Sequence, residues 1–247
     1  MKEFHCIVGN KGGVGKSLVA SLVMQYAEDQ GWGPFGIECD QSNRTLSRYE
    51  RLRTQRLELL DREQQIDRRR FDALIEMLVQ DNEPFVVMDN GQASFAPLTR
   101  YMVECHAFDI LRQRGRECFV HTVIAGGQLG SSTLRGLGDT LAAFGGDAKL
   151  AVWHNEHFGP VDQAAYDEVL KRAQVPVRGP LEIHRWSKPF EDDVQDMLGK
   201  FLTFEEALAS PDFGLMNRQR LQLVRDRVFG VLQQLLRSAF EEAVHAD

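Results

Sequence analysis

Glycines, two lysines and a hydroxyl are concentrated in the segment Gly9-Asn-Lys-Gly-Gly-Val-Gly-Lys-Ser17. Glycine lets the backbone turn tightly and aim successive N–H groups at phosphate oxygens, and a helix that follows adds its positive end. In such a loop Lys16 would reach the β- and γ-phosphates of a nucleotide, and Ser17 would hold Mg²⁺. The segment predicts a phosphate loop that binds ATP or ADP together with Mg²⁺.

The surroundings of this loop fit the prediction. A short apolar run, Phe4–Val8, precedes it and a helical pattern over Leu18–Asp29 follows, which is the strand–loop–helix order that a phosphate loop requires. The strict pattern has glycine where this chain has Asn10, and we expect asparagine to be accepted because it tolerates left-handed backbone angles. A chance match arises in roughly one chain of this length in 10⁴. We expect the nucleotide to contact a run of consecutive residues: Gly12, Gly13, Val14, Gly15, Lys16, Ser17 and Leu18.

A second motif ends in Asp89. Phe85-Val-Val-Met-Asp89 matches the Walker B pattern, in which apolar strand residues end in an acid beside the phosphate loop. Asp89 would bind Mg²⁺ through water. The same residue is also suited to begin the turn Asp89-Asn-Gly-Gln92, and the two roles are compatible.

Three more polar residues follow strand-like runs. Glu38 and Asp40, separated by one residue, lie at the end of the run that begins at Pro34, although acids at a strand end are more often plain surface residues. Asn155 follows the run Leu150–His154 and is equally well explained as an ordinary loop asparagine.

Strand-like and helical patterns alternate along the chain. The expected strands are Phe4–Val8, Pro34–Cys39, Arg56–Leu60, Phe85–Met88, Cys118–Ala125 and Leu150–His154. The expected helices are Leu18–Asp29, Arg69–Gln80, Pro97–Arg112, Ser131–Phe144, Gln163–Arg172 and Met216–Val244. This alternation predicts an α/β fold of three layers, with a mainly parallel sheet flanked by helices on both faces. We expect one domain over residues 1–247, with an amphipathic helix at about 214–244 packed against it.

Composition limits the function classes. The net charge of -7 argues against a chain whose whole surface binds nucleic acid. Between Arg44 and Arg70, however, the chain has nine arginines and five acidic residues. Ion pairs on a solvated surface explain these arginines most simply, and a local DNA-binding surface is the alternative. No run approaches the ~20 apolar residues that cross a bilayer. The four cysteines show no CxxC pairing, and a reducing bacterial cytoplasm is expected.

The loop resembles that of the ParA/MinD group of P-loop ATPases, whose deviant Walker A box has an extra lysine early in the loop, here Lys11. The resemblance implies a homodimer that forms with ATP, in which Lys11 reaches the phosphates of the other subunit. It also implies that Asp40 orients the attacking water and Glu38 lies near the Mg²⁺ shell, although the group more often has aspartate at that position. Asn155 would contact the adenine edge, and Pro180–Lys188 matches the loop that packs on the base.

Several segments are similar to the TraL/MobD group of compact ParA-like proteins encoded with plasmid conjugation and mobilisation functions. These segments are Asp40-Gln-Ser-Asn-Arg44, Ile66–Asp72, Met88–Pro97 and His121–Gln128. The similarity implies a slow ATPase switch that positions a protein–DNA transfer complex, with a relaxase or coupling protein as candidate partner, at the inner membrane or a cell pole. Two alternatives stay open: a plasmid- or chromosome-partition ATPase that binds DNA, and a MinD-like positioning ATPase that docks its last helix on the membrane.

Lys16→Ala should abolish nucleotide binding, because it removes the cation that the β- and γ-phosphates need. Equilibrium binding of ATP in the presence of Mg²⁺ measures this. Retained binding of normal strength would overturn the assignment of the phosphate loop.

Overall fold

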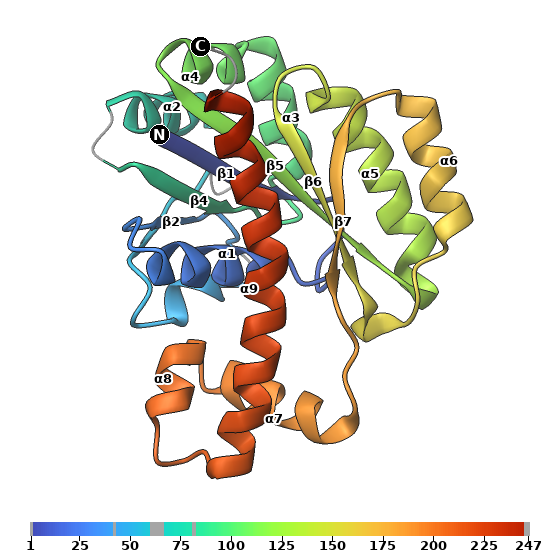
Figure 1. The fold of residues 1–247 in the computed structure, drawn as a ribbon. Helices are drawn as coiled ribbons and strands as arrows, with labels where there is room; N and C mark the ends of the chain where they lie inside the picture. Colours follow the sequence, from blue (N-terminus) through green and yellow to red (C-terminus); the bar gives the residue numbers. More distant parts are fainter. Residues whose placement is uncertain (1, 42, 60–66, 81–82, 245–247) are drawn as a thin grey trace.

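A computed structural model describes residues 2–41, 43–59, 67–80 and 83–244 of the chain. Within these residues, seven strands form one parallel sheet in the order β3-β2-β4-β1-β5-β6-β7 (Figure 1). The strands are β1 (Lys2–Val8), β2 (Phe35–Glu38), β3 (Thr54–Arg56), β4 (Phe85–Asp89), β5 (Arg116–Ala125), β6 (Lys149–Asn155) and β7 (Val177–Ile183). The expected parallel α/β architecture is confirmed.

Helices cover both faces of the sheet. The elements α2 (Arg68–Gln80), α3 (Phe95–Glu104), α4 (Ala107–Gln113), α5 (Gly130–Phe144) and α6 (Gln163–Ala173) pack on one face. The other face is covered by α1 (Lys16–Asp29), α7 (Lys188–Gly199), α8 (Phe204–Ala209) and α9 (Leu215–Val244). Short 3₁₀ turns lie at η1 (Leu46–Arg48), η2 (Gly127–Leu129) and η3 (Glu156–Phe158).

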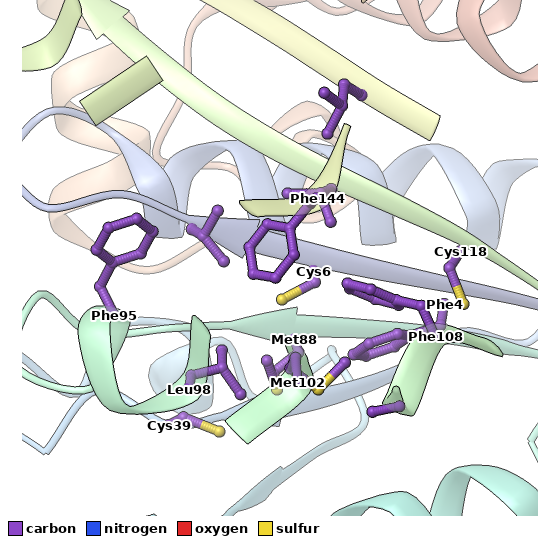
Figure 2. Packing of buried hydrophobic residues seen from close by; sticks show 14 of the residues in the cluster. Phe4, Cys6, Cys39, Met88, Phe95, Leu98, Met102, Phe108, Cys118 and Phe144 are labelled. Atoms are coloured by element: carbon purple, nitrogen blue, oxygen red, sulfur yellow. The ribbon is translucent and has the colours of Figure 1, made fainter. Parts of the chain in front are cut away.

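The core under α3, α4 and α5 is rich in sulfur and aromatic rings. Figure 2 shows Cys6, Cys39 and Cys118 among Met88 and several phenylalanines. These three cysteines are free and buried, so they pack as small apolar residues. Burial raises the pKa of each of the three thiols, which keeps them protonated.

A chain of polar side chains crosses the opposite face of the sheet. The Trp153 indole N–H donates to Nδ1 of His121 at 3.0 Å, and Nε2 of His121 lies 2.9 Å from Nδ1 of His5. Nε2 of His5 in turn lies 2.9 Å from the Glu3 carboxylate. An indole N–H can only donate, so Nδ1 of His121 accepts and Nε2–H of His121 donates to Nδ1 of His5. Nε2–H of His5 then donates to the Glu3 carboxylate, and each of the two imidazoles carries one proton. Burial and the neighbouring His5 hold the pKa of His121 well below its usual range.

Three expectations need correction. The helix expected over Pro97–Arg112 is two helices, α3 and α4, because His106 between them adopts a left-handed conformation with φ 48°. The third strand runs over Thr54–Arg56 rather than Arg56–Leu60, whose last residue lies outside the described residues. Strand β7 was not expected: Pro180–Lys188 was expected to be a loop, but its residues up to Ile183 belong to β7, an edge strand, which tolerates proline.

The last helix, α9, packs on the domain through one face. Its residues Leu221, Val224, Val228, Leu232 and Leu235 are buried against α1, α7 and α8. Side chains beyond Leu236, including Phe240, lie outside the described residues. Among the helices that the structure describes, none is long and apolar enough to cross a membrane.

His121→Leu should lower the free energy of unfolding by about 2–4 kcal/mol, because it leaves the Trp153 N–H and Nδ1 of His5 buried without partners. Urea unfolding measures this. His106→Asn, at an exposed left-handed position, is the control and should change stability by less than about 0.5 kcal/mol. Equal stability of His121→Leu and the wild type would contradict the role of the polar chain.

Candidate functional site: the phosphate loop and its neighbours

The phosphate loop lies at the carboxyl end of β1, the central strand between β4 and β5. The helix after β1, α1, packs on one face of the sheet, and the helices after β4 and β5, α3 and α5, pack on the other face. In open parallel sheets, ligands bind at the strand ends where the chain changes face in this way. Strand register brings the predicted residues together: Glu38 of β2 pairs with Asp89 of β4, and Asp89 is level with Ile7 of β1. On the other side, Asn155 ends β6 level with Ala125 of β5.

Lys16 begins α1 and its side chain lies inside the loop. The residue is 6% exposed, and Nζ donates to the Lys11 carbonyl oxygen at 2.7 Å. Burial lowers the pKa of Lys16, while the nearby Asp89 and Asp40 act in the opposite direction. The loop therefore folds around one ammonium group with two carboxylates within electrostatic reach.

Gly15 and Asn155 fix the start of α1. Gly15 has φ 107°, a left-handed angle that favours glycine, and a Cβ there would lie 2.8 Å from Nδ2 of Asn155. Nδ2 of Asn155 donates to the Val14 carbonyl oxygen at 3.0 Å, and its Oδ1 accepts from the His157 N–H at 3.1 Å. Asn155 thus supports the loop. Its predicted contact with adenine stays a prediction.

Asp89 is buried behind the loop. It is 1% exposed, and neither carboxylate oxygen has a hydrogen-bond partner of good geometry among the described residues. Burial raises the pKa of Asp89 to about 7, although the Ser17 hydroxyl and Lys16 lower it. Buried acceptors without partners call for a cation or water, so Asp89 and Ser17 fit Mg²⁺.

A Mg²⁺ site of this kind needs few side chains. No group of three or more His, Cys, Asp or Glu side chains that could hold a metal occurs in the described part of the chain. Phosphate oxygens and waters supply most Mg²⁺ ligands in nucleotide sites, and one or two side chains complete the set.

Glu38 holds the segment that follows β2. Its carboxylate accepts from the Leu46 N–H at 2.8 Å and from the Ser47 hydroxyl, and Arg56 lies 3.6 Å away. These contacts give Glu38 a structural role, and the metal role predicted for it stays a prediction. Asp40 is less enclosed, and its Oδ1 accepts from the Asn43 N–H at 3.0 Å.

Asn10 is accepted for a reason other than the one expected. The residues with left-handed φ other than glycine are His106, Gln174 and Phe201 among those described, so Asn10 does not use its left-handed tolerance. Its side chain lies against α5 instead. A Cβ on Gly136 would come within 2.4 Å of Oδ1 of Asn10, so glycine in α5 makes room for this asparagine.

Beside the loop is a cavity of about 280 Å³ that the sequence did not predict as a whole. Gly13, Gly15, Leu18 and Asn155 line one side. The opposite side comes from the β7–α7 connection, α7 and α9, with Ile183, His184, Trp186, Leu198 and Val228 among its residues. Trp186 stacks on Phe190 at 5.0 Å between ring centroids. The predicted nucleotide contacts at Gly13, Gly15, Leu18 and Asn155 lie on the near side of this cavity, and the order match of Pro180–Lys188 was the sequence signal for its far side.

One contact of the phosphate loop was also not predicted from the sequence. The Gly12 N–H donates to Oε1 of Gln92 at 2.9 Å. The sequence indicated a turn from Asp89 to Gln92, but gave the Gln92 side chain no role. Spacing alone does not show that this side chain reaches back to the phosphate loop.

Two known proteins, each named Protein TraL and each from Escherichia coli, are similar to this chain along almost its whole length. One is 33% identical over 234 residues, covering 93% of this chain and 96% of the relative. The other is 34% identical over 242 residues, covering 94% of this chain and 98% of the relative. No family model matches the chain.

Solved structures of MinD share the fold. MinD complexed with Mg-ADP from Pyrococcus horikoshii OT3 has a TM-score of 0.54 at 15% identity, covering 92% of this chain and 96% of that one. The cell division ATPase MinD of Pyrococcus furiosus has a TM-score of 0.51 at 14% identity, covering 95% and 100%. At these identities the likeness establishes the fold alone.

Asp89→Asn tests the burial of this carboxylate. The pKa of Asp89 is raised from 3.8 to about 7, so the folded chain keeps a proton that the unfolded chain has already lost. Wild-type stability should therefore fall as pH rises from about 4 to about 7 and then level off, by up to roughly 4 kcal/mol from this group. Asp89→Asn lacks this component, so its stability relative to the wild type should rise over the same range.

Urea unfolding without Mg²⁺ at a series of pH values measures the difference. Asp226→Asn, on the exposed side of α9, is the control and should follow the wild type at every pH. A constant difference between the wild type and Asp89→Asn across this range would contradict the raised pKa.

Proposed function

The chain belongs to the TraL family, and from this we propose that it is a Mg²⁺-dependent ATPase switch of plasmid conjugative transfer or mobilisation. It binds ATP, hydrolyses it slowly to ADP and phosphate, and alternates between an ATP-bound homodimer and an ADP-bound state. Such a switch requires contacts that differ between the two nucleotide states.

The observation that carries the proposal is the buried Lys16 within the loop. Its ammonium lies against the Lys11–Gly12 peptide, within electrostatic reach of the buried carboxylate of Asp89. The backbone N–H groups of the loop and the start of α1 supply the positive potential that phosphates need. This arrangement supports binding of a nucleoside triphosphate rather than of an uncharged ligand.

For hydrolysis, the residues divide the tasks between binding and orientation. Mg²⁺, held by Ser17 and Asp89, would neutralise charge on the phosphates. Lys16 binds and orients the β- and γ-phosphates. Asp40 is close enough to affect the titration of both Lys16 and Asp89, and we assign it the orientation of the attacking water.

The cavity beside the loop is our candidate for the base and sugar. It opens onto Gly15 and Leu18, so a nucleotide whose phosphates lie in the loop would extend into it. Trp186 and Ile183 offer apolar surface to a purine, and Glu182 and His184 offer polar groups at its edge. This shape supports the predicted nucleotide contact at Leu18.

Lys11 supports the dimer proposal. Its side chain is half-buried and makes no ion pair with any residue that the structure describes. A lysine in the phosphate loop without an acid of its own chain is suited to reach phosphates on another subunit. A relaxase or coupling protein is the proposed partner of the dimer.

The arginines between Arg44 and Arg70 favour the transfer role over a partition ATPase that binds DNA. Arg51 pairs with Glu205, Arg53 with Glu83, and Arg70 with Asp67. Arg48 stacks on the Phe201 ring at 3.6 Å. These pairings agree with the expected ion-paired surface; the side chains of Arg62 and Arg68 lie outside the described residues.

For membrane docking, the relevant element is α9. The apolar face of its described part is used in packing on α1, α7 and α8, which supports a location in the cytoplasm with contact to the inner membrane or cell pole through partners. A failure to co-sediment with anionic vesicles in ATP is the expected outcome for this chain.

Lys11→Ala should retain part of the nucleotide binding but weaken ATP-dependent dimerisation and ATP turnover by about tenfold or more, as loss of a charged contact to phosphate does. Light scattering with ATP and Mg²⁺ measures the dimer, and phosphate release measures turnover. Lys171→Ala, on an exposed position of α6, is the matched control. Equal dimer formation by Lys11→Ala and the wild type would refute the role across subunits.

A further inference from the structure

Gln92 joins the loop after β4 to the phosphate loop. Its Oε1 accepts from the Gly12 N–H at 2.9 Å. The carbonyl of the same peptide unit, that of Lys11, accepts from Nζ of Lys16 at 2.7 Å. One peptide therefore lies between Gln92 and the ammonium group that binds the β- and γ-phosphates.

The approach of Gln92 depends on glycine. A Cβ at Gly12 would lie 2.9 Å from Oε1 of Gln92, and a Cβ at Gly91 would lie 2.9 Å from Cα and Cγ of Asp40. The turn at residues 91–92 is thus wedged between Asp40 and the phosphate loop. A side chain at Gly91 would push the turn away from Asp40, and a side chain at Gly12 would displace the Gln92 side chain from the Gly12 N–H.

The same turn leads directly into α3. The Ser94 hydroxyl donates to Oδ1 of Asn90 at 2.7 Å, which closes the turn, and the next residue, Phe95, is buried in the core. A displacement of Gln92 would therefore be transmitted to the first turn of α3. Val103, near the end of that helix, is 43% exposed and is available to a partner.

A phosphate oxygen would compete with Gln92 for the Gly12 N–H. Charged oxygens accept hydrogen bonds more strongly than neutral amide oxygens, and N–H groups of such loops are the usual donors to phosphate. We propose that Gln92 senses the γ-phosphate: exchange of the Gly12 N–H between Gln92 and the terminal phosphate distinguishes ATP from ADP and moves residues 90–94 with α3. This inference rests on the proposed function, and Gln92 acts in it as a positioning residue.

Nucleotide affinity is the first test, measured on the full chain with Mg²⁺ and either ADP or a non-hydrolysable ATP analogue. Gln92→Glu keeps the shape and the acceptor but adds a negative charge next to the γ-phosphate. Its affinity for the ATP analogue should fall by about tenfold or more, and its affinity for ADP by less than about threefold. Gln92 is exposed, so substitution should leave the fold intact, and ADP binding confirms this in the same experiment.

Hydrogen exchange over residues 90–104 is the second readout. In the wild type, exchange in this segment should differ between ADP and the ATP analogue. In Gln92→Ala the difference should be reduced to less than about half, because the Gly12 N–H is no longer shared. Gln113→Glu and Gln113→Ala, at the exposed end of α4, are the matched controls and should behave as the wild type.

The outcomes separate the two proposals. A wild type that binds neither nucleotide overturns the proposed function and the role of Gln92 with it. A wild type that binds both, together with Gln92 variants that keep the wild-type ratio of ATP-analogue to ADP affinity and the exchange difference in α3, overturns the role of Gln92 alone.

Discussion

The site depends on keeping one ammonium group, that of Lys16, almost fully out of water. Burial disfavours its charge, and the structure offsets this with the Lys11 carbonyl and with Asp89 and Asp40 nearby. Asp89 is itself buried and holds its proton more tightly than an exposed acid. A phosphate group and a magnesium ion would relieve both costs at once, and this is the physical basis on which we propose that the loop binds a charged nucleotide.

Every other element around the loop serves to position these groups. The parallel sheet brings β2, β4, β1, β5 and β6 to one edge, and Asn155 supports the loop from the β6 side. On the β2 side Glu38 fixes the segment after that strand, and Gly136 of α5, a helix that packs on β5, leaves room for Asn10. The site is therefore formed at the ends of five strands. The phosphate loop lies at the centre of the site, and residues from the other strand ends surround the loop.

The sequence predicted what depends on neighbours along the chain. Glycine spacing, Lys16, Ser17 and the apolar run before Asp89 are local signals, and the structure places these residues together. Contacts between distant segments were not predictable in this way: Gln92 against Gly12, Asn155 on Val14, and the Trp186 side of the cavity. Strand β7 was missed because Pro180–Lys188 was expected to be a loop, and proline in a strand is accepted at a sheet edge, a position that the local sequence does not show.

Calorimetric titration of the full chain with ATP in the presence of Mg²⁺ tests the central claim most directly. A buried Lys16 flanked by Asp89 and by the loop N–H groups predicts saturable binding of one ATP per chain, with weaker binding when Mg²⁺ is chelated. A folded chain that shows no saturable heat with ATP and Mg²⁺ would contradict the account.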